Sequence, residues 1–214
     1  MSGIAAAFAL AREDGSVICR TRKPMLQREA AGLAGFLTES LVCAGYELPD
    51  IAEWTVGSGP GSFTGMRLAA ALVAGLSRGR DGVKVRCVPT AVAIADTLEI
   101  PSGTLETVLF DGRNHEIIAY ELKRGEGGSA PLGTSAVLNQ EQAADYFAAH
   151  PDAVFITQRH ELDAVLRLVP ENVELKVVEE FDPAALISAD CQEFDNVFSR
   201  LEYIRPAVFP KKAE

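Results

Sequence analysis

The sequence predicts an α/β protein of two similar lobes with mixed sheets. Each half of the chain opens with a hairpin signal and continues with alternating strand-like and helix-like stretches, although the sequence itself is not repeated. Turn-forming residues at Ile100-Pro101-Ser102-Gly103 separate the two halves. We therefore expect an N-terminal lobe at 1–101 and a C-terminal lobe at 102–214.

The N-terminal half begins with a hairpin and a helix. Asp14-Gly15 lies between the β-prone runs Ile4–Ala11 and Val17–Thr21, which is a strong hairpin signal. Apolar residues then recur at helical spacing along one face of Gln27–Ala44, and Gly45 is the expected end of that helix.

The stretch that organises this half starts at the β-prone run Ile51–Val56. Glycines and a proline follow the run, and the apolar pattern then resumes at helical length, which indicates a strand, a tight turn and a helix. Ser62 or Thr64 is the expected N-cap of the helix.

The helix after this turn lacks a polar face. From Gly65 to Gly79 its only charge before Arg78 is Arg67, whereas a surface helix normally carries a polar side. Its alanines and glycines would let a second helix approach closely. One side can cover the sheet and the other has no obvious cover within the chain, so we expect this helix to face a partner.

The remaining elements follow the same alternation. Asn139, with Gln142 at the position of a capping box, should begin a helix that ends near Ala149. The other expected elements are a strand at Val83–Val88, a helix at Ala91–Leu98, a hairpin of Leu105–Phe110 and Glu116–Leu122 around a turn at Asp111–Asn114, a flexible loop at Arg124–Gly133, strands at Val154–Thr157 and Val173–Val178, a helix at Leu162–Leu168 and a last helix from about Pro183.

Composition excludes several classes of function. The 214 residues carry a formal net charge of −10, and the only basic cluster, Arg20–Lys23, is short, which argues against a nucleic-acid-binding surface and against anionic membranes. No secretion signal or apolar run of membrane-spanning length is evident, so we expect a cytoplasmic protein. The cysteines are widely scattered and predict reduced thiols rather than zinc ligands or disulfides: Cys19, Cys43, Cys87 and Cys191.

No catalytic constellation stands out. A glycine-rich strand-to-helix turn can present amides to a phosphate, but neither the P-loop lysine nor the third glycine of the dinucleotide motif is in place, so a structural turn is favoured over a nucleotide site. Ser62 lacks the flanks of a hydrolase nucleophile. Asp111 and Glu116 could pair for acid–base work or bind a metal, but a turn-forming role is favoured. The histidines lack metal-ligand spacing and are expected at element ends: His115, His150 and His160.

The motif Gly59-Pro60-Gly61-Ser62-Phe63-Thr64-Gly65-Met66-Arg67 resembles the signature of the TsaB (YeaZ) family. These are non-catalytic subunits of the machinery that makes threonylcarbamoyladenosine in tRNA. Weaker matches occur in the family's order along nearly the whole chain: the Asp14-Gly15 hairpin, Pro89-Thr90-Ala91, Asp111-Gly112-Arg113 with Glu116, and Tyr203-Ile204-Arg205. The chain resembles a divergent member.

The resemblance implies an actin-like (ASKHA) fold of two ribonuclease-H-like lobes, with neither metal nor cofactor. It implies that the protein pairs with a TsaD-like transferase subunit, or with a second copy of itself, through the helices Gln27–Ala44 and Thr64–Arg78. It also implies that a TsaE-like ATPase joins the complex and that the protein contacts tRNA only indirectly. The expected partner-interface residues are Leu33, Leu37, Leu41, Met66, Ala69, Ala70, Val73 and Ala74. The structural motif loop comprises Gly59, Pro60, Gly61, Ser62, Phe63, Thr64, Gly65 and Arg67.

One departure from the family concerns the first strand. Family members usually begin with a strand that ends in Asp-Thr-Ser or Asp-Thr-Ala, ahead of the strand that precedes the Asp-Gly hairpin. This sequence starts at Met1-Ser2-Gly3, so either the true start lies upstream or the N-terminal sheet has lost a central strand. Loss of a central strand would expose two unpaired edges.

Two other functions remain open. The first is an actin-like ATP-binding small-molecule kinase or carbamoyl-type transferase. The second is a glycoprotease, the old label of this superfamily, which the lack of paired histidines disfavours.

Overall fold

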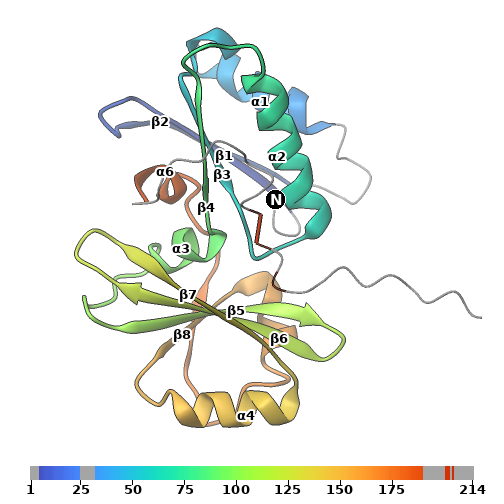
Figure 1. The fold of residues 1–214 in the computed structure, drawn as a ribbon, viewed down its shortest axis with the longest axis vertical. Coiled ribbons are helices and arrows are strands. Elements are labelled where there is room, and N and C mark those ends of the chain that lie inside the picture. The colour runs from blue at the N-terminus through green and yellow to red at the C-terminus, as the bar shows by residue number, and fades with distance from the viewer. Residues whose placement is uncertain (1–4, 25–31, 190–200, 203, 205–214) are drawn as a thin grey trace, which may run out of the picture.

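The computed structural model describes residues 5–24, 32–189, 201–202 and 204. Figure 1 shows the elements of the N-terminal half at one end of an elongated molecule and a five-stranded sheet at the other. Predicted features that lie outside the described residues are the start of the Gln27–Ala44 helix, Cys191, Tyr203 and Arg205, and the chain beyond Ala189 that was expected to continue the last helix. No helix in the described ranges has the length and apolar character needed to cross a bilayer.

Over the residues that the structure describes, the N-terminal half holds two separate two-stranded sheets and two long helices. The hairpin of β1 and β2 is antiparallel, whereas β3 and β4, which precede and follow the helix α2 in the chain, pair in parallel. The elements in order are β1 (Ala5–Ala11), β2 (Val17–Pro24), α1 (Leu33–Cys43), the 3₁₀ turn η2 (Leu48–Asp50), β3 (Glu53–Gly57), α2 (Phe63–Ser77), β4 (Lys84–Val88) and α3 (Thr90–Ala95).

Two predicted positions are confirmed, namely the Asp14-Gly15 turn of the first hairpin and the end of α1 at Gly45. Gly15 has φ +82° in the β1–β2 turn, and Gly45 has φ +82° just after α1. There the amide of Gly45 donates to the carbonyl of Val42 and the amide of Tyr46 to that of Leu41, which is the double hydrogen bond of a Schellman C-cap.

The C-terminal half is built on one mixed sheet in the order β7-β6-β5-β8-β9. The central strand β5 pairs antiparallel with β6 and parallel with β8. The Asn139–Gln142 capping box at the start of α4 is confirmed. The elements are β5 (Leu105–Arg113), β6 (Glu116–Arg124), β7 (Ser129–Leu138), α4 (Gln140–Ala149), β8 (Val154–Gln158), the 3₁₀ turn η3 (Arg159–Glu161), α5 (Leu162–Val165), β9 (Leu175–Val178) and α6 (Ala185–Ser188).

Two expectations for this half were wrong. The predicted flexible loop Arg124–Gly133 contains the end of β6 and the first half of β7, which continues to Leu138. β7 is an edge strand, where Pro131 and Gly133 are tolerated because the outer backbone groups need no partner strand. The predicted Asp111–Asn114 turn is also displaced, because β5 continues to Arg113 and the positive φ angles fall on Arg113, Asn114 and His115.

The central strand β5 of the five-stranded sheet is buried on both faces. Along β5, Val108 and Phe110 point into a cluster with α3, while Leu109 between them points into a cluster with α4 and α5, as the two-residue period of a strand requires. Figure 1 shows α4 and α3 on opposite sides of this sheet.

The end of the chain returns to the N-terminal half. Leu201 belongs to the core cluster that contains Trp54, Met66 and Leu41. Arg86 of β4 donates to the carbonyl of Ala189 at 3.1 Å and also to that of Ile187. The C-terminal segment therefore ties the two halves together, while a boundary at 101 stays a prediction.

Candidate functional site: the glycine loop and the paired helices

Backbone hydrogen bonds hold the loop between β3 and α2 to three other segments of the chain. The amide of Ser58 donates to the carbonyl of Val88 at 2.8 Å, and the amide of Thr90 donates to the carbonyl of Gly59 at 2.6 Å. The amide of Glu202 donates to the carbonyl of Ser58 at 2.9 Å. One loop thus joins the end of β4, the start of α3 and the C-terminal segment.

Gly57, at the end of β3, and Gly59, in the loop, are closely packed. Gly59 has φ +113°, and a Cβ placed there would lie 2.5 Å from Sδ of Met66. A Cβ on Gly57 would lie 3.0 Å from Oγ1 of Thr90. Ser58, Gly59 and Pro60, with a cis bond between Gly59 and Pro60, are all buried. These contacts favour the structural turn over a loop that cradles a phosphate.

The rest of the predicted motif begins α2. Ser62 is the N-cap, and its Oγ accepts the amide of Gly65 at 3.3 Å, so the choice between Ser62 and Thr64 is settled for Ser62. Gly61 is half-buried and Gly65 buried, whereas Thr64 and Arg67 are exposed. The backbone of Phe63 forms the first residue of the helix.

The residues predicted for a partner interface lie mainly inside the protein. Those that are buried belong to the protein's own core: Leu33, Leu37, Leu41, Met66, Ala70 and Val73. Ala69 and Ala74 are half-buried. Leu33 and Phe36 of α1 pack against Leu68 and Leu72 of α2. The apolar faces of the two helices are therefore largely buried against each other and against the sheets.

The exposed residues of α1 and α2 lie next in sequence to the buried residues that were predicted for the interface. On α2 the exposed residues recur at intervals of three or four: Thr64, Arg67, Ala71, Gly75 and, just beyond the helix, Arg78. On α1 they are Ala34, Gly35, Thr38, Glu39, Val42 and Cys43, of which Val42 is 62% exposed. We call the exposed set Thr64, Arg67, Ala71 and Gly75 the outer face of α2. The sequence pattern pointed to α2, but only the structure separates its core residues from this outer face.

The residues weighed for chemistry lie apart. His115 is in the β5–β6 turn, His150 is the C-cap of α4 with Nδ1 2.8 Å from the carbonyl oxygen of Tyr146, and His160 lies in η3. Oδ1 of Asp111 accepts the amide of Arg113 at 2.8 Å, which is the turn-forming role predicted for it. Over the described ranges no three His, Cys, Asp or Glu side chains are grouped to hold a metal ion.

A buried charge network was missed by sequence reasoning. The guanidinium of Arg124 on β6 donates to Glu106 of β5 and to Asp96 after α3, at 2.8 and 2.9 Å, and to the carbonyls of Ala95 and Leu98. The hydroxyl of Ser129 lies 2.7 Å from both carboxylates. Glu106 is fully buried, so these groups serve to hold α3 on the sheet.

A second polar contact holds the end of the chain. The hydroxyl of Tyr120 donates to Oε1 of Glu202 at 3.1 Å. Burial raises the pKa of the Glu202 carboxyl, and the Tyr120 hydrogen bond lowers it by less. Glu202 directly precedes the predicted Tyr-Ile-Arg match, but this contact was not itself predicted.

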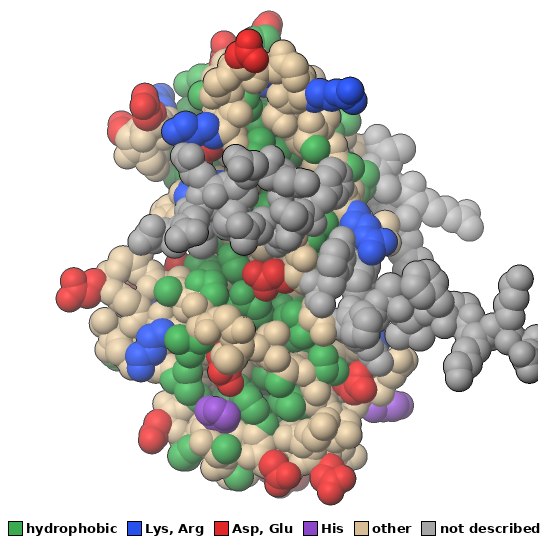
Figure 2. Space-filling view, viewed as in Figure 1, with side chains coloured by type: hydrophobic (Ala, Val, Ile, Leu, Met, Phe, Trp, Pro, Cys, Tyr) green, Lys and Arg blue, Asp and Glu red, His purple; other side chains and the backbone are tan. Residues whose placement is uncertain are grey.

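The surface offers no concentration of positive charge on the face seen in Figure 2. Lys and Arg side chains there are scattered singly among acidic ones.

The sheet order and its helices define the class of fold. A central strand with an antiparallel hairpin on one side and two parallel strands on the other, covered by helices on both faces, is a ribonuclease-H-like α/β arrangement. The chain has the predicted mixed α/β fold of the actin-like (ASKHA) type.

Comparisons with known proteins give the family. Residues 29–147, more than half of the 214-residue chain, match the family described as TsaD: tRNA N6-adenosine threonylcarbamoyltransferase. The chain belongs to this family.

Solved structures share the fold. YeaZ from Pseudomonas aeruginosa matches with a TM-score of 0.69 and 24% identity, over 87% of this chain and 85% of that one. A second structure, of an uncharacterized protein with similarity to peptidase YEAZ from Pseudomonas aeruginosa, matches with a TM-score of 0.68 at the same identity and coverage. No curated protein matches.

Proposed function

We propose that this protein is a non-catalytic subunit of the cytoplasmic machinery that makes threonylcarbamoyladenosine in tRNA. In this role it binds and supports a TsaD-like transferase subunit, with a TsaE-like ATPase joining the assembled complex. The family match and the YeaZ-type fold support a place in tRNA modification.

The outer face of α2 is the observation that carries the scaffold role. Ala71 and Gly75 are exposed, and open space surrounds the point where a Cβ on Gly75 would lie. Because the distance between packed helices depends on the side chains at the contact, such a face admits a close helix–helix approach. A second copy of this chain could use the same face, which makes a homodimer the competing assembly.

The glycine loop supports a non-catalytic role. Its buried groups bond to Val88, Thr90 and Glu202 of the same chain rather than pointing into an open site. The alternative is an ATP-binding kinase or carbamoyl-type transferase, favoured by the family's description as a transferase. Stabilisation of the isolated protein by ATP would support the alternative, and unchanged melting would count against it.

Depletion of the protein in its own organism tests the proposal. We expect the threonylcarbamoyladenosine content of bulk tRNA, measured by nucleoside mass spectrometry, to fall and to recover when the wild-type gene is supplied. A variant with Ala71→Glu and Gly75→Glu should restore it poorly. The matched control is Ala144→Glu with Ala148→Glu, two exposed positions four residues apart on α4. Unchanged modification after depletion would contradict the proposed function.

A further inference from the structure

One segment of the C-terminal half reaches across to the N-terminal half. Residues 180–189 follow β9 and include α6, and Figure 1 shows α6 between the β1–β2 hairpin and α3. We call residues 180–189 the strap. Over the part of the chain that the structure describes, backbone–backbone hydrogen bonds of the strap join only residues of the strap itself. Contacts of side chains therefore hold it to the N-terminal half.

Two arginines of β2 form ion pairs with the strap. Nε of Arg20 donates to both carboxylate oxygens of Asp182 at 2.8 Å. Nη1 of Arg22 lies 3.2 Å from Oε2 of Glu180. Because alternate residues of a strand point to the same face, both arginines face the strap. The short basic cluster noted in the sequence thus makes contacts within the chain.

A third arginine, on β4, binds the far end of the strap. The guanidinium of Arg86 donates to the carbonyl of Ala189 at 3.1 Å and to that of Ile187. Nε of the same side chain donates to Oγ1 of Thr55 on β3 at 3.0 Å, which holds the guanidinium in place. The last carbonyls of a helix have no partner within it, so a cation fixed there stabilises the end of α6.

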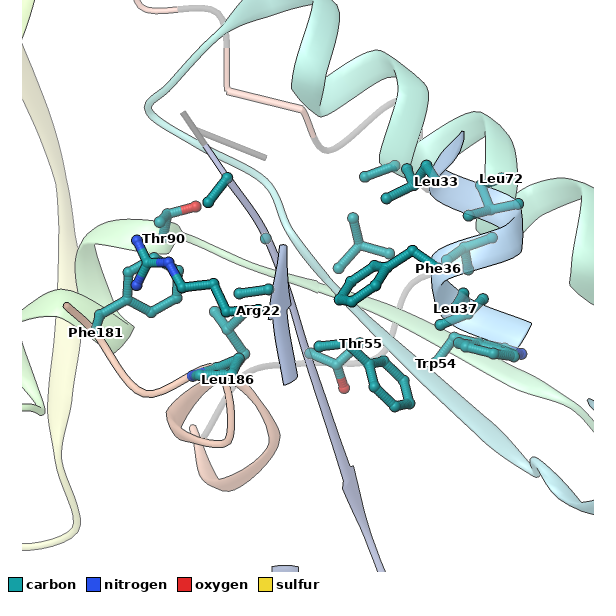
Figure 3. Close-up of a pocket in the computed structure, with 18 of the residues that line it drawn as sticks. Arg22, Leu33, Phe36, Leu37, Trp54, Thr55, Leu72, Thr90, Phe181 and Leu186 are labelled. Atoms are coloured by element: carbon teal, nitrogen blue, oxygen red, sulfur yellow. The ribbon is translucent and has the colours of Figure 1, made fainter. Parts of the chain in front are cut away.

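Apolar contacts add to these polar ones. Phe181 and Leu186 of the strap pack against the core cluster that contains Val88 and Ala91. Figure 3 shows Phe181 and Leu186 on the same side of a cavity as Arg22, and all three line that cavity. The strap is therefore held by both charge and apolar burial.

The three arginines differ in exposure. The side chains of Arg20 and Arg22 are 52% and 26% exposed, whereas that of Arg86 is 14% exposed. Salt screens exposed charges much more than buried ones, and the screening length falls from about 10 Å at 0.1 M to about 3 Å at 1 M salt. The two ion pairs from β2 are therefore the salt-sensitive part of the attachment.

We propose that the strap is an electrostatic clasp between the two halves, which the ion pairs of Arg20 and Arg22 close at low ionic strength and which salt loosens. An exposed ion pair favours the paired state by a factor of about 1.5 to 5, so two pairs shift the ratio of closed to open clasp by about 2- to 25-fold. The sheets of both halves stay folded when the clasp opens. This device goes beyond the proposed function, since the outer face of α2 includes neither β2 nor the strap.

Hydrogen exchange of the wild-type protein at two salt concentrations tests the clasp. We expect amides of the strap to exchange at least about threefold faster in about 1 M than in about 0.05 M sodium chloride, because the opened clasp exposes them. The paired strands β5 and β6 give the internal reference, since their hydrogen bonds do not involve the strap. Strap exchange that does not change with salt, relative to this reference, would overturn the proposal.

Charge reversal on β2 gives a second test. Arg20→Glu with Arg22→Glu should speed exchange of the strap at low salt by at least about threefold and abolish its acceleration by salt. The matched control is Arg159→Glu with Lys176→Glu, which changes the net charge equally and breaks two exposed ion pairs within the C-terminal half. An unchanged strap in the first variant, or equal acceleration in the control, would overturn the proposal. The salt test uses the unaltered protein, so it holds whether or not the reversed variant folds.

An exchange of one ion pair separates attraction from a general loss of stability. Arg22→Glu alone should loosen the strap, and Arg22→Glu with Glu180→Arg should restore part of the wild-type protection. Asp182 is left in place because its Oδ1 also accepts the amide of Ala184 at 2.9 Å. A double variant no better protected than Arg22→Glu would overturn the proposal. None of these readouts involves a transferase subunit, so the proposed function is tested independently.

Discussion

Gly59 and Met66 are packed so closely that a Cβ on Gly59 would lie 2.5 Å from Sδ of Met66. The backbone of Gly59, with φ +113°, is also in a region that L-residues rarely adopt. Met66 is 3% exposed and belongs to the core of the N-terminal half. The contact therefore fixes the loop before α2 against that core.

Replacement of Gly59 by alanine should destabilise the protein. We expect Gly59→Ala to lower the free energy of unfolding by about 1–3 kcal/mol, because a strained backbone is added to a steric clash. Chemical denaturation monitored by circular dichroism gives this value. Gly75→Ala is the matched control, since a Cβ there meets open space in a helix and should stabilise by about 0.5–1 kcal/mol. Equal stability of Gly59→Ala and wild type would show that the contact is unimportant.

Removal of Arg124 should be far more damaging than removal of a surface arginine. Arg124→Met leaves Glu106, which is fully buried, and Asp96 without their cation, so we expect a loss of about 3–5 kcal/mol. Arg159→Met is the control, because Arg159 and Glu179 form an exposed ion pair. Thermal and chemical denaturation compare the two variants. Losses of similar size in both would contradict the structural role of the network.

The Glu202 carboxyl should make stability fall as pH rises. Burial raises its pKa above the ordinary value of 4.5, so between the unfolded and folded pKa values the folded state binds more protons than the unfolded state. Its contribution is full below the unfolded pKa and is lost as pH rises through the folded pKa. Glu202→Gln should therefore raise the melting temperature at about pH 7 and have little effect near pH ~4. The exposed Glu126→Gln serves as a control, and a Glu202→Gln effect that does not vary with pH would disprove this account.

Features with local chemical signals could be predicted from the sequence. Asn139 with Gln142 marked the start of α4, Ser62 was one of two candidates for the cap of α2, and Gly45 marked the end of α1, because caps depend on residues within one turn. β7 was missed because Pro131 and Gly133 break the alternation, and an edge strand with an exposed outer side does not require it.

The candidate site was less predictable because it depends on contacts distant in sequence. The small residues of α2 indicated close packing, but the pattern could not tell that Ala70 is fully buried while Ala71 is exposed. Charged residues normally indicate surface, so the burial of Glu106 beside Arg124 had no sequence signal.

The measurement that tests the central claim most directly is the mass, by light scattering, of this protein mixed with the TsaD-like transferase subunit of its own organism. We predict a stable complex with the wild type and with Ala144→Glu, Ala148→Glu. The Ala71→Glu, Gly75→Glu variant should remain folded by circular dichroism and fail to form it. A wild type that elutes only as separate components, or an Ala71→Glu, Gly75→Glu variant that binds as well as wild type, would contradict the outer face of α2 as the interface.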